Sequence, residues 1–99
     1  MRTTIPTSFV LANRKWTVEV VDLIDNDPDV LGTCSLDEAL ITLKARADRS
    51  LLEDTFFHEF IHAVRGTLGH KDNKKNHAEV DAIGSMFHQF LQTKKGRLL

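Results

Sequence analysis

The chain has 99 residues, enough for one small domain with a single hydrophobic core and too few for two. Hydrophobic residues make up 41% of it and charged residues 27%, with two prolines and five glycines, which excludes a disordered or fibrous chain. Thirteen basic residues stand against fourteen acidic ones, and the net charge of -1 gives no field that would attract nucleic acid or an anionic membrane.

The compartment can also be predicted from composition. The one cysteine, Cys34, cannot form an intramolecular disulfide and suits a reducing environment. No run approaches the roughly twenty apolar residues of a membrane helix, and residues 1–6 lack the apolar stretch of a secretory signal. We therefore expect a cytoplasmic protein that binds neither membrane nor nucleic acid.

The first half of the chain, about 8–44, is typical of β-structure. Segments 8–11 and 16–21 are rich in β-branched and aromatic residues, and the polar dipeptide at 13–14 between them indicates a hairpin. A third strand is predicted at 39–44. Residues 35–38, which precede it, could instead open a short helix.

The second half has helical periodicity. A first helix is predicted over about 50–68, capped by Asp48 or Ser50, with Glu53 and Asp54 in its electropositive first turn. Strands followed by helices indicate an α+β fold: a small twisted sheet of about three strands packed on two long C-terminal helices.

The second helix follows a polar loop. Gly69 is expected to end the first helix, and the second is predicted over about 76–93. A basic tail, 94–99, completes the chain. All these elements together form one predicted domain, 1–99.

The chemistry is indicated by His58, Glu59 and His62, which match H-E-x-x-H inside the first predicted helix. Four residues advance a helix by slightly more than one turn, so the two histidines lie on one face and can share a tetrahedral zinc ion. Glu59 is offset around the helix, where in H-E-x-x-H proteins the carboxylate acts as general base on the zinc-bound water. The apolar flanks argue against a solvated face that carries this pattern by chance.

A catalytic zinc usually takes three protein ligands and leaves one position open. The longer pattern H-E-x-x-H-x-x-G-x-x-H is excluded, because Arg65 and Leu68 stand where it requires glycine and histidine. The third ligand is therefore expected on the second helix, where the candidates are His77, Glu79 and Asp81.

Helical geometry ranks these candidates. At about 100° per residue, Glu79 shares a stripe with residues that are predicted to face the core: Ala82, Ile83, Met86 and Phe90. His77 and Asp81 share theirs with Gly84 and His88, a stripe that is predicted to be solvated. An ionised carboxylate on an apolar stripe needs a strong partner, which a metal ion supplies. Glu79 is therefore favoured. His77 is the alternative, since a small rotation of the helix would turn its side chain toward the metal.

At this point the sequence resembles the gluzincins, zinc peptidases with H-E-x-x-H on one helix and a glutamate ligand on the next. It is similar above all to the single-domain minigluzincins, some encoded by phages and prokaryotes, so a phage-encoded chain would act in the host cytoplasm. The resemblance is carried by T-F-F-H-E-F-I-H-A-V at 55–64 and H-A-E-V-D-A at 77–82. It implies one zinc per chain held by His58, His62 and Glu79, Glu59 as general base, and an edge strand at 40–43 that binds the peptide.

The chain departs from larger gluzincins in having no tyrosine to stabilise the oxyanion. The remaining candidate donors are His70, His77, His88 and Arg65. The function that follows is a zinc metallopeptidase acting on a peptide or protein substrate. The alternative is a catalytically silent zincin-like module that binds metal or another protein, but the intact Glu59 favours the enzyme because metal binding alone would not require it.

Overall fold

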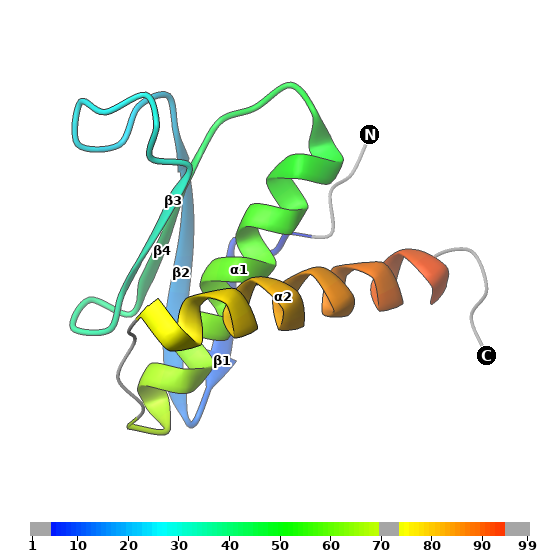
Figure 1. The fold of residues 1–99 in the computed structure, drawn as a ribbon. Helices are drawn as coiled ribbons and strands as arrows, with labels where there is room; N and C mark the ends of the chain where they lie inside the picture. Colours follow the sequence, from blue (N-terminus) through cyan, green and yellow to red (C-terminus); the bar gives the residue numbers. More distant parts are fainter. Residues whose placement is uncertain (1–4, 70–73, 95–99) are drawn as a thin grey trace.

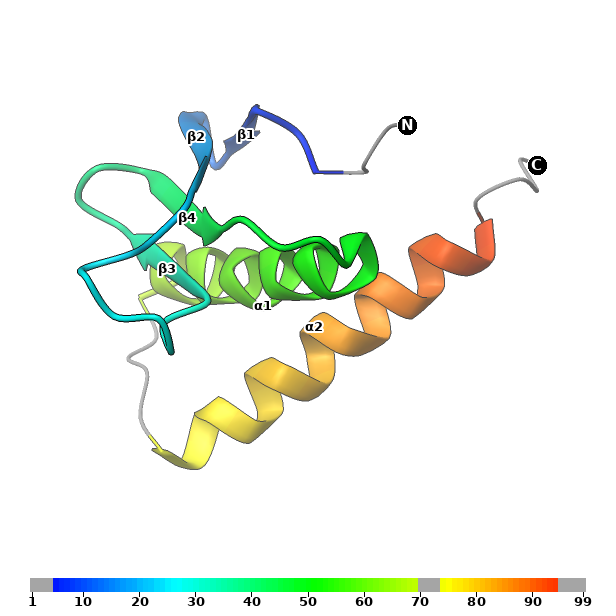
Figure 2. The ribbon, with the colours of Figure 1, turned by 90° about the horizontal axis from the view of Figure 1, so that it is seen from above.

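The computed structural model describes residues 5–69 and 74–94, which form a four-stranded mixed sheet and two helices (Figure 1). The elements in chain order are β1 (Ser8–Leu11), β2 (Arg14–Val21), β3 (Gly32–Ser35), β4 (Leu40–Lys44), α1 (Arg49–Thr67) and α2 (Lys74–Lys94). Seen from above, α1 lies between the sheet and α2 (Figure 2). The α+β class is as predicted, and α1 packs against the sheet on one side and against α2 on the other.

The predicted hairpin is confirmed. β1 pairs antiparallel with β2, and a two-residue loop joins Leu11 to Arg14. Both loop residues, Ala12 and Asn13, have positive φ values of 51° and 65°, which match the type I′ turn that suits the twist of a hairpin. β2 starts two residues before its predicted beginning.

The prediction of about three strands was wrong by one. β3 was not predicted, because Gly32-Thr33-Cys34-Ser35 is short and has no apolar alternation. It pairs antiparallel with β4, and β4 pairs parallel with β2, so the sheet order is β1-β2-β4-β3. Residues 36–39 form the turn between β3 and β4 rather than the short helix that was considered.

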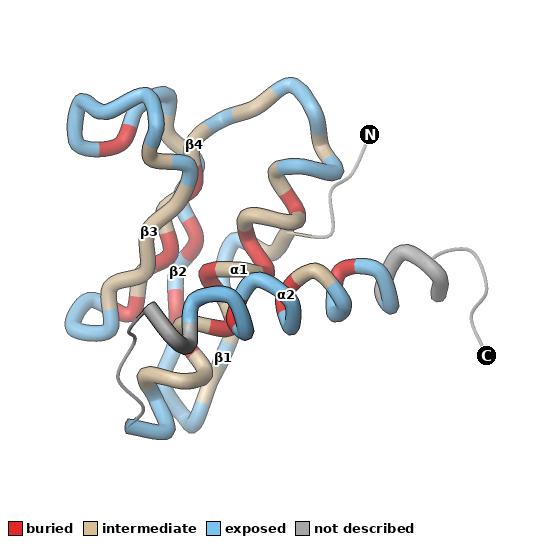
Figure 3. Tube along the Cα trace, in the orientation of Figure 1, coloured by how far each residue is buried: buried red, intermediate tan, exposed pale blue. Residues whose placement is uncertain are grey.

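The hydrophobic core lies between the sheet and α1 (Figure 3). Ile41 and Leu43 alternate inward on the central strand β4 and are fully buried, as is Trp16 on β2. Phe56 and Phe57 close this core from the side of α1. The H-E-x-x-H helix is therefore fixed against the sheet by its apolar residues.

The ends of α1 follow from local side chains. Asp48 is the N-cap, and its carboxylate accepts a hydrogen bond of 3.0 Å from the backbone N–H of Leu51. Gly69 lies just past the C-terminal end of α1, as predicted, and adopts the left-handed conformation (φ 86°). The placement of Glu53 and Asp54 in the first turn was wrong, because the helix begins at Arg49 and Glu53 is fully buried one turn further on.

The face that α2 presents to α1 is the opposite of the predicted one. Val80, Gly84 and His88 are buried, whereas Met86 and Phe90 are 59% and 58% exposed. The prediction that the apolar stripe faces the core was therefore wrong, and the predicted solvated stripe is exposed at His77 and Asp81 but buried at Gly84 and His88. α2 also begins two residues earlier than predicted and ends one residue later.

Gly84 explains this orientation, because α2 crosses α1 at this residue. A Cβ atom at position 84 would lie 3.1 Å from the backbone N and 3.2 Å from the Cα of His58. A larger residue cannot approach the backbone of α1 so closely. The stripe that contains the glycine therefore permits a closer helix contact than the bulky apolar stripe does.

We expect Gly84→Val to lower the free energy of unfolding by about 1–3 kcal/mol, as overpacking of a close contact does. For a chain of this size, each kcal/mol changes the melting temperature by about 4–8 °C. Ala82→Val introduces the same β-branched side chain at an exposed position of α2 and is the control. Equal melting temperatures for the two variants would contradict the close crossing.

Two predicted features lie outside the described residues. These are His70, with most of its loop, and residues 95–99 of the basic tail. Within the described residues, no helix is long and apolar enough to cross a membrane.

Candidate metal centre

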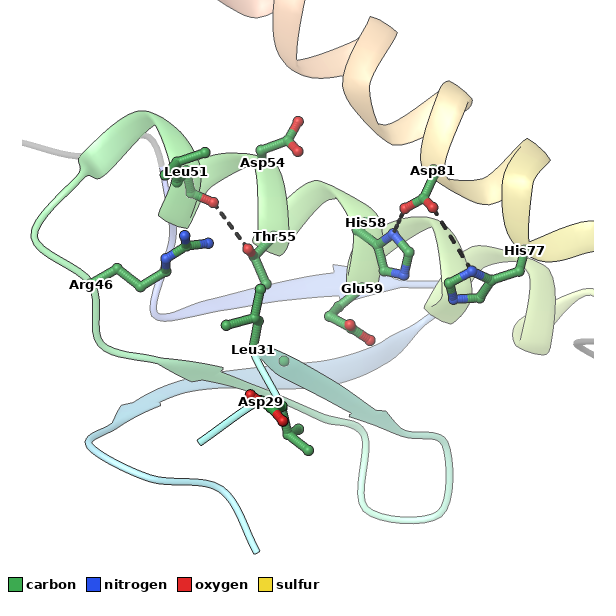
Figure 4. A pocket seen from close by; sticks show the side chains of 12 residues that line it. Asp29, Leu31, Arg46, Leu51, Asp54, Thr55, His58, Glu59, His77 and Asp81 are labelled. Atoms are coloured by element: carbon green, nitrogen blue, oxygen red, sulfur yellow. Dashed lines mark hydrogen bonds and ion pairs between the residues drawn. The ribbon is translucent and has the colours of Figure 1, made fainter. Parts of the chain in front are cut away.

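His58 lies on α1 opposite the N-terminal half of α2, where His77 and Asp81 approach it (Figure 4), and His62 follows about one turn later on α1. Their Nε2 atoms are 3.1 Å apart. Two nitrogen ligands at about 2.0–2.1 Å from a tetrahedral zinc ion are separated by about 3.3 Å. The spacing of the two histidines therefore fits a shared zinc ion.

His77 of α2 completes a group of three imidazoles. Its ring centroid lies 5.1 Å from that of His58 and 5.6 Å from that of His62. Each of the three residues offers a nitrogen atom, and these atoms lie within 4.8 Å of one another. Three neutral imidazoles are a donor set that suits zinc and leaves a fourth position open.

Glu79, the favoured third ligand, is not brought to the histidine pair. Its side chain is 61% exposed, and its Oε1 atom lies 3.4 Å from Nη1 of Arg65. The difference follows from the orientation of α2, which places His77 beside the two histidines of α1 and Glu79 beside Arg65. Of the two candidates that the sequence left open, the structure places His77 at the site.

Asp81, the remaining candidate, lies behind the imidazoles. Its Oδ1 atom is 2.5 Å from Nδ1 of His58, and its Oδ2 atom is 3.8 Å from Nδ1 of His77 (Figure 4). A carboxylate that accepts the Nδ1–H proton fixes the tautomer in which Nε2 carries the free lone pair. Asp81 can therefore orient His58 for metal binding, a role that sequence analysis did not assign. Its spacing of four residues from His77 indicates a contact with His77, but the contact with His58 depends on how the two helices pack.

Glu59 lies on the sheet side of the histidines and is 8% exposed. A Cβ atom at Gly32 of β3 would lie 3.2 Å from its Oε2 atom and 3.1 Å from its Cγ atom. The absence of a side chain at position 32 thus makes room for the carboxylate. Gly32 was not among the predicted site residues.

A cavity of about 470 Å³ opens in front of these groups. Glu59, His58, His77 and Arg46 are among the residues that line it (Figure 4), and Gly32 of β3 lines it as well. This volume is within the range of small-molecule and peptide side-chain sites. A substrate group in the cavity would be next to both the imidazoles and the Glu59 carboxylate.

The expected substrate strand requires a correction. The segment 40–43 lies in β4, which is hydrogen-bonded on both sides, to β2 and to β3. It therefore has no free edge for a peptide. Among residues 5–69 and 74–94, the free edge on this side of the sheet belongs to β3, where Gly32 adjoins Glu59.

The candidate oxyanion donors are separated by the fold. His77 is at the imidazole group, Arg65 contacts Glu79, and His88 is buried beside Glu53. Of these three, the structure brings His77 to the cavity.

Comparisons of this chain with protein-family models, with curated proteins and with solved structures find no match. A functional assignment therefore depends on the side-chain geometry described above.

Proposed function

We propose that the protein is a zinc-dependent metallopeptidase whose metal is held by His58, His62 and His77. The observation that carries this proposal is the convergence of three imidazole nitrogens within 4.8 Å beside the buried carboxylate of Glu59. Metal binding alone would require the histidines but not Glu59. The proposal keeps the chemistry that the gluzincin resemblance implies, but it replaces the glutamate ligand of that family with a histidine.

The bound zinc would lower the pKa of a water molecule to about 7 and polarise the substrate carbonyl. Glu59 would accept the proton of this water during attack and return it to the leaving amine nitrogen. Asp81 would hold His58 in the metal-binding tautomer. The residues in these roles, Glu59, His58 and Asp81, all line the cavity.

The substrate would bind as an extended peptide along the free edge of β3. Backbone hydrogen bonds of this kind give affinity without a deep side-chain pocket. Since Gly32 adjoins Glu59, a peptide paired with β3 would pass directly in front of the general base. A small domain can bind a peptide in this way with few specificity contacts.

We expect the purified chain to contain about one zinc ion and to cleave unstructured peptides in a reaction that a chelator stops and added zinc restores. Metal content is measured by mass spectrometry of the dialysed protein, and cleavage by mass spectrometry of a peptide mixture. One zinc ion without cleavage would support the alternative, a metal-binding module without turnover. Undiminished cleavage by a chain from which the chelator has removed the zinc would contradict the proposal.

A further inference from the structure

A second polar cluster joins α1 to α2, separate from the three imidazoles. Glu53 of α1 is 1% exposed and His88 of α2 is 6% exposed. The Nε2 atom of His88 lies 3.1 Å from Oε1 of Glu53. A carboxylate is costly to bury unless it is paired, so this contact favours the arrangement that keeps the two residues together.

The second ring nitrogen of His88 also lies near an acidic side chain. Its Nδ1 atom lies 3.5 Å from Oδ1 of Asp54, which accepts a hydrogen bond of 3.1 Å from the hydroxyl of Ser85. The ring of Phe57 stacks on the imidazole at a centroid distance of 5.7 Å. Both ring nitrogens of His88 thus face α1, beside the residue that precedes the metal-ligand candidate His58.

His88 and His77 occupy the same stripe of α2. They are eleven residues apart, which is about three turns, and Gly84 lies between them on this stripe. The helix contacts α1 far more than it contacts the sheet, so its rotation about its own axis is set mainly at the α1 interface. The contacts that hold His88 against α1 therefore also keep His77 next to His58 and His62.

A second face of α2, which is apolar, competes with the His77 face for packing against α1. Ile83, Met86 and Phe90 form an exposed apolar stripe roughly half a turn away from His77. The hydrophobic effect favours burial of this stripe, and a rotation that buried it would move Glu79 from Arg65 toward the middle of the α1 interface and carry His77 away from it. Buried polar pairs can select one arrangement of helices over another even where they add little stability.

We propose that the Glu53–His88 pair sets the rotation of α2 and thereby selects His77 over Glu79 as the third metal ligand. Both are positioning residues, because they act through His77 and touch neither metal nor substrate. The inference depends on the metal site of the proposed function, but it does not depend on peptide cleavage.

The test uses the full chain loaded with cobalt(II), whose visible absorption reports the number and type of its ligands. Glu53→Met and His88→Leu each break the pair. Glu53→Gln keeps a hydrogen-bond acceptor for His88 and is the conservative variant. Met86→Leu changes the exposed side of α2 and is the matched control. Circular dichroism confirms that each variant is folded.

We expect Glu53→Met and His88→Leu to change the cobalt spectrum and to weaken cobalt binding at least about tenfold. Glu53→Gln and Met86→Leu should keep the wild-type spectrum. In the His88→Leu chain, a further Glu79→Ala change should alter the spectrum again, since Glu79 would then lie near the metal. The same Glu79→Ala change in the wild-type chain should alter nothing.

A folded Glu53→Met variant with the wild-type cobalt spectrum and affinity would overturn the proposal. If His88→Leu does not fold, the Glu53→Met variant alone tests the role of the pair. A wild-type chain that binds no cobalt would instead remove the metal site itself, and with it both this inference and the proposed function. Cobalt binding with the expected variant spectra but no peptide cleavage would leave the positioning role established and reject only the peptidase. The three results are therefore distinguishable.

Discussion

Glu59→Gln is expected to reduce peptide hydrolysis by about 10²- to 10⁴-fold while zinc stays bound. Glutamine keeps the size of the side chain and fits beside Gly32, but its amide cannot accept the proton of the attacking water. The three imidazoles are unchanged by this substitution, so zinc affinity should remain close to that of the wild-type chain. The measurement is cleavage of one peptide by both chains, each with its zinc content determined.

Glu79→Gln is the matched control, because it removes the same charge from an exposed side chain that contacts Arg65. Its cleavage rate should stay within a few-fold of the wild-type rate. Loss of zinc from Glu59→Gln would identify Glu59 as a ligand and not a base. Full activity of the zinc-loaded Glu59→Gln chain would exclude it from the chemistry altogether.

The features that follow from local sequence were predicted well. A polar interruption between two apolar segments indicates the hairpin, although its loop lies at 12–13 and not at 13–14, and Asp48 and Gly69 mark the ends of α1 to within one residue. The approach of His58 to His62 follows from helical spacing within α1 alone, and the structure shows their Nε2 atoms 3.1 Å apart. These predictions needed no knowledge of the other elements.

The orientation of α2 could not be predicted in the same way. Periodicity shows that a helix has an apolar face, but it does not show that this face is the buried one. In α2 the close approach at Gly84 and the pairing of His88 with Glu53 both depend on residues of α1 that are more than twenty positions away. These long-range contacts turn the polar stripe inward and place His77 at the site.

The free edge of the sheet was missed for a related reason. β3 has too few apolar residues to be recognised from its sequence, and it is stabilised by pairing with β4. If β3 is not recognised in the sequence, β4 is predicted to be an edge strand and therefore the segment that binds the peptide. The sheet order decides this point, and it depends on pairings between strands that local patterns do not contain.

His77→Ala is expected to remove most of the zinc-dependent rise in melting temperature, and Glu79→Ala to leave it intact. A ligand that binds only the folded state stabilises it by RT ln(1 + [Zn]/Kd), or about 2.7 kcal/mol at a hundredfold excess over Kd. For a domain of this size the rise corresponds to roughly 10–20 °C. The measurement is a melting curve for each variant, with zinc and with chelator.

The chelator curves are the control for effects that are unrelated to metal. The side chains of His77 and Glu79 are 58% and 61% exposed, so neither substitution should destabilise the metal-free chain by much more than the 0–1 kcal/mol of a surface ion pair. A difference seen only with zinc is then a difference in coordination. A normal zinc response in His77→Ala, with none in Glu79→Ala, would require α2 to be turned by roughly half a rotation from the arrangement described here. That result would restore the glutamate ligand of the gluzincins and remove the role of the Glu53–His88 pair.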